Sequence, residues 1–303
     1  MSNSAAGQAR AAVAAGLGAG IVWGFVPIIF QAVARAGPDQ WEVLTQRIIW
    51  GGAAAAVFVA FARQWPQVAR VFRERRTLGW LALSAVLIAI NWVVFIWAVN
   101  NGRVLESALG YYITPLMSMA AGALMFGERL GKIGLTAILL ATLGVVIQGF
   151  ALGALPLVAL ALAASFGSYG IVRKHVAADA QTGLLIECLI LSPAALAFIA
   201  WQAHAGHATF FQSPVAAAWL IGAGAITAAP LALFAWGARR MPLSAMGFIQ
   251  FLSPTIAFVI GVMQGEAFTP MRAVSFAFIW LGAAVFVFGA VQAARRVRAP
   301  SAA

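Results

Sequence analysis

The chain has 303 residues, of which 63% are hydrophobic and only 9% are charged, and its formal net charge is +11. Because a soluble domain carries roughly 25% charged residues, this deficit excludes a soluble protein with one anchor and indicates a polytopic membrane protein. The basic residues lie in short breaks between apolar runs, which is typical of membrane topology and argues against nucleic-acid binding. The single cysteine, Cys188, excludes an internal disulfide and a cysteine-based metal cluster.

The charged breaks divide the chain into ten apolar segments, each close to the roughly 20 residues that a membrane-spanning helix needs. The first segment is too long for the core of a signal peptide, so we interpret it as a retained helix. We therefore predict an all-α polytopic membrane protein with ten transmembrane helices, a short N-terminal tail (1–11) and a basic C-terminal tail (293–303). The predicted helices are 12–34, 41–62, 78–99, 104–126, 131–150, 153–173, 181–202, 214–237, 241–264 and 269–292.

The distribution of basic residues predicts the orientation of these helices. With a cytoplasmic N-terminus, 15 of the 19 Lys and Arg residues lie in cytoplasmic segments, three lie in outer breaks and Arg47 lies within the second helix. Such a split is the positive-inside pattern of membrane proteins. We therefore predict that the N-terminus and the C-terminus are both cytoplasmic.

One polar and aromatic motif occurs twice, at Trp97–Pro115 and at Trp236–Pro254, with the same spacing in both places. This repetition predicts two similar halves, 12–150 and 151–292, with five helices each. Because five is an odd number, the second half must enter the membrane from the opposite face. The sequence therefore predicts an inverted repeat, an architecture common among secondary transporters, whose substrate sites lie between the repeats.

Several further motifs follow one another in a fixed order between residues 12 and 290. Together they resemble the RarD subfamily of the EamA-type drug/metabolite transporter superfamily. The resemblance implies two EamA repeats (12–150 and 151–292), a location in the bacterial inner membrane, and export or exchange of small metabolites. The motifs are Glu42–Trp50, Asn91–Asn100, Glu106–Leu116, Gly127–Leu130, Ser165–Lys174, Thr227–Leu231 and Gly247–Thr255.

Polar and aromatic side chains inside the apolar segments are the candidates for a substrate site. Tyr111, Thr114 and Ser118 share one face of their predicted helix, and such a stripe is either a packing seam or a cavity wall. We expect Tyr111 and Thr114, beside Pro115, to line a cavity, because a proline frees a backbone carbonyl. The predicted substrate-binding residues are Trp23, Asn91, Trp92, Tyr111, Thr114, Ser165, Tyr169 and Gln250.

Each of these residues also has a structural interpretation. Asn91 lies within a predicted span and needs a partner there, so it either lines the cavity or forms an interhelical hydrogen bond worth roughly 1 kcal/mol. Trp97 lies near the outer end of its helix, where a tryptophan is typical of the interfacial belt. Trp92 lies deeper, where we expect an aromatic cavity wall.

Two charged residues, Arg47 and Glu187, lie within predicted spans at nearly equivalent places in the second and seventh helices. A charge at the centre of a span costs about 2.5–3.5 kcal/mol, so each needs a partner or a wet cavity. Arg47 either extends to the outer headgroups or pairs with Glu42, and Glu187 is either a neutral hydrogen-bonded carboxyl or a proton-coupling group. The predicted gating or coupling residues are Arg47, Asn100, Glu106 and Glu187.

Catalysis is not indicated by the sequence. The predicted spans contain no aspartate, the three histidines lie in or near loops, and neither a phosphate-binding loop nor a metal-ligand motif is present. We predict a protein that is not an enzyme, without a cofactor, a metal or a catalytic residue. Its predicted partners are a small-molecule substrate and membrane lipids, without nucleic acid, and it is a monomer or a homodimer.

The predicted function is that of a secondary transporter in the bacterial inner membrane. Its substrates would be small organic metabolites, namely amino acids, related amphipathic compounds or drugs. We expect the protein to export them by alternating access around a central cavity. The alternatives are a channel-like pore and a membrane interaction protein without transport activity. Saturable transport and counterflow distinguish a carrier from either alternative.

Overall fold

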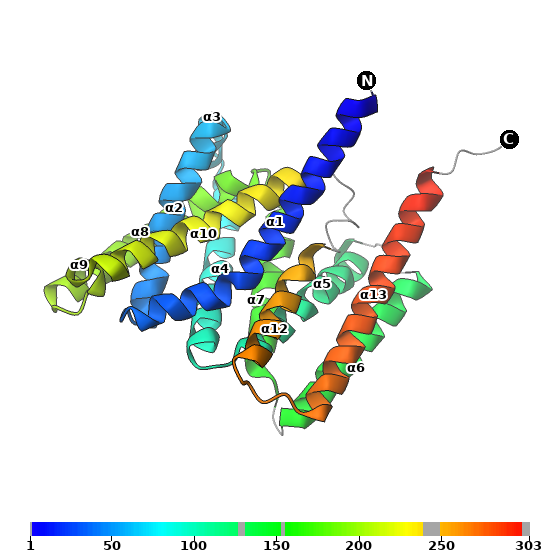
Figure 1. Cartoon of the computed structure of the whole chain (residues 1–303). Helices are drawn as coiled ribbons and strands as arrows, with labels where there is room; N and C mark the ends of the chain where they lie inside the picture. The colour runs from blue at the N-terminus through cyan, green and yellow to red at the C-terminus, as the bar shows by residue number, and fades with distance from the viewer. Residues whose placement is uncertain (1, 127–130, 153–154, 239–248, 299–303) are drawn as a thin grey trace. The chain divides into compact units, whose positions relative to one another are not determined.

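The structure is helical throughout the part of the chain that it describes, which comprises residues 2–126, 131–152, 155–238 and 249–298. It is a computed structural model, and these residues contain no strand (Figure 1). The described helices are α1 (Ser2–Arg35), α2 (Gln40–Phe61), α3 (Trp65–Arg73), α4 (Arg75–Asn100), α5 (Val104–Phe126), α6 (Lys132–Leu152), α7 (Leu157–Lys174), α8 (Ala180–His204), α9 (Thr209–Gln212), α10 (Pro214–Ala238), α12 (Leu252–Met263) and α13 (Pro270–Arg298).

Seven of the described helices are long and apolar enough to cross a membrane, namely α1, α2, α4, α6, α8, α10 and α13. The helices α7 and α12 are also apolar but shorter. A helix suits the bilayer because all its backbone hydrogen bonds are made within the segment. The prediction of an all-helical polytopic membrane protein is therefore confirmed, whereas the total of ten spans and the orientation of the termini stay predictions.

The structure differs from the predicted segments mainly between the spans. The first helix was predicted to begin at residue 12, whereas the structure has helix from Ser2, because the alanine-rich sequence of the N-terminal tail favours helix. The predicted break at 63–77 contains a separate short helix, α3. The predicted ninth span is described only from residue 249, so its residues 241–248 lie outside the described chain. Residues 153–154 of the sixth span and 299–303 of the C-terminal tail also lie outside it.

The chain forms two compact units, each built from several separate stretches of sequence. The first unit comprises residues 1–24, 104–167 and 237–303, and the second comprises residues 25–103 and 168–236. Each unit therefore combines helices from the first and the second half of the chain.

The second unit is organised around α2 and α8, which pack antiparallel along their length. Gln202, near the end of α8, donates a 2.8 Å hydrogen bond to Asp39, the residue that caps the start of α2. At the other end, Gln64 follows α2 and donates a 2.6 Å hydrogen bond to Asp179, which precedes α8. Between the two ends the helices approach closely, because a Cβ at Gly52 would lie 3.0 Å from that of Cys188. At both ends of the pair, a glutamine thus donates a hydrogen bond to the aspartate that precedes the other helix.

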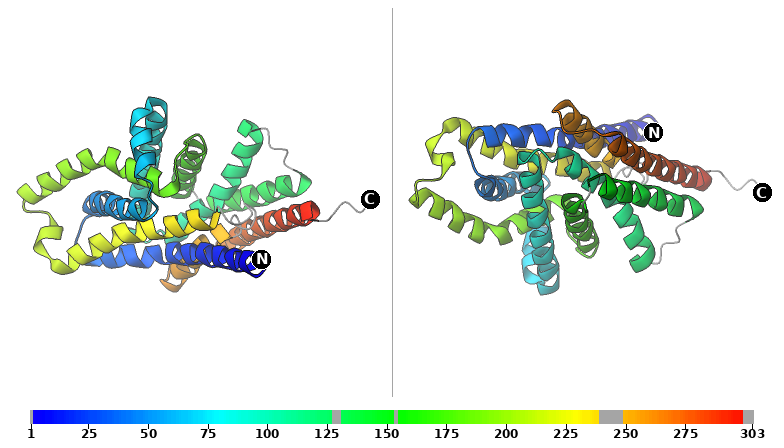
Figure 2. Two further views of the ribbon diagram at one scale, coloured as in Figure 1. Left: turned by 90° about the horizontal axis from the view of Figure 1, so that it is seen from above. Right: turned by 90° about the horizontal axis from the view of Figure 1, so that it is seen from below.

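The first unit contains two further antiparallel helix pairs, α6 with α13 and α5 with α12. The helices α6 and α13 lie side by side (Figures 1 and 2). Ser275 donates a 2.7 Å hydrogen bond to the carbonyl oxygen of Gly144, and a Cβ at Gly282 would lie 2.8 Å from the carbonyl oxygen of Ala137. Such close backbone approach at small residues is how helices associate in a membrane, where the hydrophobic effect does not drive them together.

Candidate functional site

Buried polar side chains gather mainly in the second unit, on α2, α4 and α8. A polar group in a membrane-spanning helix is costly unless it is hydrogen-bonded, so a cluster of such groups is a candidate functional site. Within this unit the described buried polar residues are Glu42, Thr45, Gln46, Arg47, Thr77, Ser84, Asn91, Thr182, Glu187, Gln202 and Thr227.

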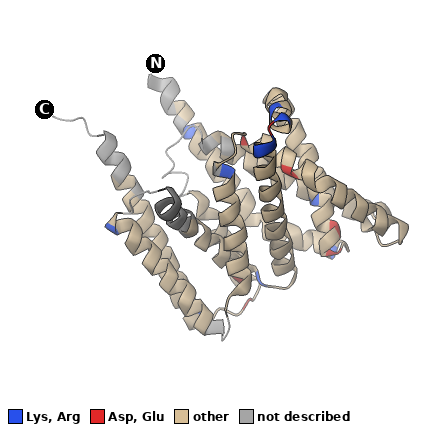
Figure 3. Ribbon diagram, turned by 180° about the vertical axis from the view of Figure 1, so that it is seen from behind, with Lys and Arg blue, Asp and Glu red and all other residues tan. Residues whose placement is uncertain are grey.

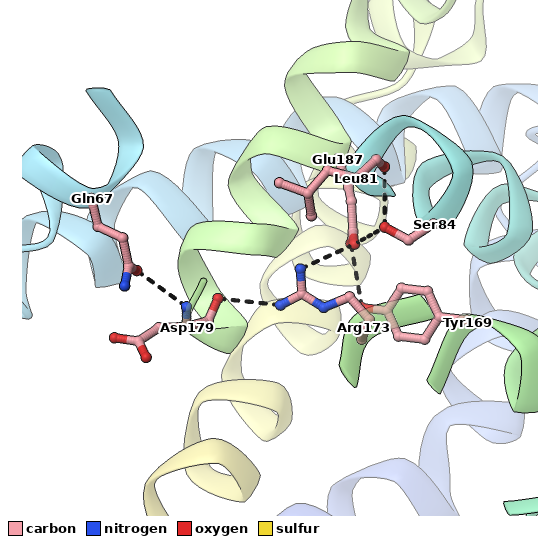
Figure 4. A network of polar contacts seen from close by, with 7 residues as sticks. All are labelled: Gln67, Leu81, Ser84, Tyr169, Arg173, Asp179 and Glu187. Atoms are coloured by element: carbon pink, nitrogen blue, oxygen red, sulfur yellow. Dashed lines mark hydrogen bonds and ion pairs between the residues drawn. The ribbon is translucent and has the colours of Figure 1, made fainter. Parts of the chain in front are cut away.

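Glu187 on α8 is the most completely enclosed acidic side chain of this cluster and is fully buried. Its Oε1 atom accepts a 2.5 Å hydrogen bond from the hydroxyl of Ser84 and lies 3.4 Å from Nη1 of Arg173. Its Oε2 atom accepts a 3.3 Å hydrogen bond from the hydroxyl of Tyr169 (Figure 4). Both carboxyl oxygens are therefore engaged by groups from α4 and α7, and Arg173 balances the charge.

The contacts of Glu187 continue as a polar chain toward the start of α8. Nη2 of Arg173 donates a 3.2 Å hydrogen bond to the carbonyl oxygen of Asp179. The backbone N–H of Asp179 donates a 3.1 Å hydrogen bond to the side chain of Gln67 on α3 (Figure 4). Gln64, which bonds the Asp179 carboxylate, also accepts a 2.9 Å hydrogen bond from Thr182. The chain of contacts thus connects the buried carboxyl to the short helix α3.

Arg47 on α2 forms the second charged centre of the cluster and is 8% exposed. Its guanidinium carbon lies 4.4 Å from the centre of the Trp92 ring and 4.9 Å from that of Phe30. Its Nε atom donates a 2.8 Å hydrogen bond to the hydroxyl of Thr227 on α10. Aromatic faces stabilise a cation most strongly where water is absent, so this setting accommodates the charge within the helices.

Arg47 and Glu187 belong to neighbouring, antiparallel helices but lie at different depths. Gly52 faces Cys188, so Arg47 lies five residues along α2 from the level of Glu187's neighbour. Because the two helices are antiparallel, Glu187 lies one residue further away in the opposite direction. At 1.5 Å per residue, the backbone positions of Arg47 and Glu187 are therefore separated by roughly 9 Å along the helix axis. The ion pair of Glu187 is accordingly with Arg173.

In the first unit, the predicted site residues lie along α5 and α7. Tyr111 contacts Phe166 edge-on, with ring centres 5.9 Å apart. Thr114 donates a 3.1 Å hydrogen bond to the carbonyl oxygen of Gly110, and Ser165 donates a 2.7 Å bond to that of Ala161. Both hydroxyl groups therefore donate a hydrogen bond to a backbone carbonyl of their own helix.

The neighbouring Tyr112 takes the central position in this unit. It is fully buried, its hydroxyl lies 2.6 Å from that of Thr255, and it accepts a 2.7 Å hydrogen bond from Nε1 of Trp280. Its ring stacks on Phe251 with a centre-to-centre distance of 6.2 Å. Tyr112 thus joins α5, α12 and α13 as a structural centre of the first unit.

The other predicted residues are more scattered. Asn91 is buried on α4, Trp23 is half-buried on α1, Asn100 is exposed at the end of α4, and Gln250 is exposed just before α12. Glu106 is half-buried in the first turn of α5. The structure thus brings Arg47 to Trp92 and Tyr169 to Glu187.

Glu266, between α12 and α13, closes the start of α5. Its two carboxyl oxygens accept hydrogen bonds of 2.6 and 2.9 Å from the backbone N–H groups of Val104 and Leu105. These groups have no partner within the helix, so the carboxylate acts as a cap supplied from a distant part of the chain. Burial raises the pKa of Glu266, and the two backbone hydrogen bonds and Arg272 oppose this shift.

Comparison with known proteins connects this arrangement to a family. The model of the EamA-like transporter family matches residues 10–149. The protein RarD of Escherichia coli is 40% identical over 291 residues, which cover 95% of this chain and 98% of that protein. An uncharacterized transporter of Vibrio cholerae is 38% identical over 300 residues, with 96% and 97% covered. This chain belongs to the RarD branch of the EamA-like transporters.

The RarD-type chain is therefore a membrane transporter, which has a small-molecule substrate and lies among lipids. The chloramphenicol-sensitive protein RarD of Pseudomonas aeruginosa is a further relative, 31% identical over 248 residues, with 80% of this chain and 83% of that protein covered. A solved crystal structure is similar in fold, with a TM-score of 0.58 at 17% identity over 90% of this chain and 97% of that one. At this identity the likeness concerns the fold alone.

The sequence prediction for this RarD-type transporter did not include several residues that hold the charged centres. Arg173 follows the predicted Tyr169 by four residues and so shares its helix face, which is the signal that could have found it. Ser84 and Thr227 are isolated hydroxyl residues within apolar helices. Such residues also occur at many helix-packing positions, so their presence alone does not mark a functional site. Nothing in the sequence around Phe30 distinguishes it from the other phenylalanines.

Proposed function

We propose that the chain is a secondary transporter of ten helices, arranged as two inverted repeats of five with both termini cytoplasmic. It would lie in the bacterial inner membrane as a monomer or homodimer. In this proposal it exports small organic metabolites, namely amino acids, related amphipathic compounds or drugs, by alternating access. The resemblance to the family supports export as the direction, and the bacterial relatives support the inner membrane as the location.

The observation that carries the proposal is the pairing of helices within each unit. In the predicted numbering of ten spans, α2 and α8 are the second and seventh, α5 and α12 the fourth and ninth, and α6 and α13 the fifth and tenth. Each of these pairs is antiparallel, and each joins a helix to the one five positions later. Two halves with opposite orientation would produce such pairs, which supports an inverted repeat.

The equivalent ends of the α2–α8 pair give independent support. Asp39 precedes α2 and Asp179 precedes α8, and each accepts a hydrogen bond from a glutamine near the end of the other helix. The buried charges Arg47 and Glu187 also occupy the corresponding helices, and each contacts a hydroxyl residue of a third helix. In the proposal these two charges serve gating or coupling.

The proposed substrate residues are the candidates predicted from sequence. Trp92 and Tyr169 are the members that contact the charged centres, so we place them nearest to the coupling step. Tyr111, Thr114, Ser165, Asn91, Trp23 and Gln250 would contribute to substrate recognition, and Asn100 and Glu106 would act as gating residues near the membrane surface.

Counterflow in proteoliposomes tests the proposed function. Purified protein would be reconstituted with a panel of amino acids and related amphipathic compounds inside the vesicles, with and without a pH gradient. A carrier predicts saturable exchange that is accelerated by substrate on the opposite side. Flux that does not saturate and shows no counterflow would favour a pore, and no flux for any member of a broad panel would contradict a metabolite carrier.

A further inference from the structure

The short helix α3 combines three faces of different chemistry. Val68 and Val71 are buried against the protein. Trp65 and Phe72 are about half exposed and, seven residues apart, lie on one side of the helix. Arg70 and Arg73 are exposed on the next side. Going round the helix, a protein-facing edge is therefore followed by an exposed aromatic edge and then by a basic edge.

The position of α3 places these faces at the membrane surface. It connects α2 to α4, and both are long and apolar enough to span the membrane. A segment of nine residues between two consecutive spans must lie at the face where the first leaves the bilayer and the second enters it. An amphipathic helix at this depth buries its apolar edge at the boundary between headgroups and acyl chains.

Basic residues are concentrated on and beside α3. Figure 3 shows where the basic and acidic residues lie along the helices. Between residues 63 and 76 the only acidic side chain is that of Glu74, and all the arginines of this stretch are exposed. A local positive charge of this size attracts the anionic headgroups of phospholipids. The arginines are Arg63, Arg70, Arg73, Arg75 and Arg76.

We propose that α3 is a binding site for anionic phospholipids. In this site Arg70 and Arg73 contact the headgroup phosphate, while Trp65 and Phe72 lie among the upper parts of the acyl chains. The combination of an exposed aromatic edge with a basic edge selects a lipid over a soluble phosphate, because a soluble phosphate would leave the aromatic side chains in water.

The lipid site is connected to the buried carboxyl by hydrogen bonds. Gln67 of α3 accepts from the backbone of Asp179, whose carbonyl oxygen accepts from Arg173, and Arg173 pairs with Glu187 (Figure 4). A shift of α3 on binding lipid would therefore reach Arg173 through Gln67. This part of the inference rests on the proposed function: anionic lipid regulates transport by setting the position of Arg173.

Lipid binding is measured on its own, without transport. The full-length protein in neutral detergent would be titrated with phosphatidylglycerol or phosphatidylcholine, and retained lipid counted by native mass spectrometry. The double variant Arg70→Gln with Arg73→Gln should bind phosphatidylglycerol at least tenfold more weakly. The matched control, Arg35→Gln with Arg103→Gln, removes the same charge at the opposite ends of α2 and α4 and should bind like the parent. Equal binding by both double variants would overturn the lipid site.

Regulation is tested by counterflow in vesicles of phosphatidylcholine with or without phosphatidylglycerol. The parent should exchange substrate several-fold faster in anionic vesicles, and the Arg70→Gln, Arg73→Gln variant should lose this difference. Gln67→Leu should still bind the lipid but exchange at the same rate in both vesicles. A parent that exchanges equally in both, while retaining the lipid, would overturn the regulatory link and leave the binding site and the carrier function standing.

Discussion

Replacing Glu187 with glutamine should abolish the response of transport to a pH gradient while substrate exchange continues. The amide keeps the shape of the carboxyl and retains an oxygen to accept from Ser84, but it cannot release or bind a proton. Gradient-driven efflux should fall at least tenfold, whereas counterflow without a gradient should stay within a few-fold of the parent. Both are measured in the same proteoliposomes.

The matched control for this variant is Glu42→Gln. Glu42 is a second buried carboxyl of the same unit, at the opposite end of the α2–α8 pair, where it accepts a 2.8 Å hydrogen bond from the backbone of Phe210. It should retain the pH response. Loss of the response in both variants, or in neither, would contradict a specific coupling role for Glu187.

A more disruptive change, Glu187→Ala, tests how much the carboxylate contributes to the stability of the fold. It would leave Arg173, whose side chain is 13% exposed, without its carboxylate. Removing one partner of a buried ion pair costs on the order of 3–5 kcal/mol. We therefore expect this variant to unfold at a markedly lower temperature than Glu187→Gln.

Replacing Arg47 with alanine should have the second largest effect, chiefly on stability. The change removes two cation–π contacts and the hydrogen bond to Thr227, and it leaves a gap beside Phe30 and Trp92. A desolvated cation–π contact is worth about 2 kcal/mol, so the loss should be on the order of 2–4 kcal/mol. The midpoint of unfolding in detergent or in a nanodisc measures it.

Two further substitutions assign this loss to its causes. Thr227→Val leaves both cation–π contacts in place and removes the hydrogen bond from Arg47, together with the bond that Thr227 donates to the carbonyl oxygen of Ala223 in its own helix. The interhelical bond should be worth only about 0.6 kcal/mol, the average for a polar contact between membrane helices. Arg47→Lys keeps the charge but loses the planar guanidinium, so its stability should lie between that of the parent and that of Arg47→Ala. If Thr227→Val destabilised as much as Arg47→Ala, the aromatic contacts would not be the source of the stabilisation.

The helical membrane class could be predicted from the sequence because the high share of hydrophobic residues and the low share of charged residues indicate it directly. The apolar runs and the charged breaks mark the long helices, and the family was predicted from the order of the motifs. The short helix α3 is not predicted because nine residues with three polar or charged members resemble a loop in a membrane protein. Amphipathic periodicity over so few residues gives little evidence until neighbouring helices supply a surface for Val68 and Val71.

The structure buries both of the charged residues that were predicted within spans, Arg47 and Glu187. They could be predicted because a charge within an apolar run is visible in the sequence. Their partners were not predictable in the same way. Arg173 and Glu187 are 14 residues apart along the chain, and they meet only because the chain turns back between α7 and α8. The same limit applies to Tyr112, which adjoins the predicted Tyr111: periodicity identified one face of the helix, but tertiary packing buried the other tyrosine.

We propose above all that the two halves of the chain enter the membrane in opposite directions. This proposal is tested by single cysteines in a Cys188→Ala background, at exposed positions that flank the α2–α8 pair: Arg35→Cys and Ala205→Cys at one end, Ala62→Cys and Ala177→Cys at the other. With opposite orientations, a membrane-impermeant maleimide added to spheroplasts should label positions 35 and 205, and should label positions 62 and 177 only after lysis. Labelling of positions 35 and 205 from opposite faces would contradict the inverted arrangement.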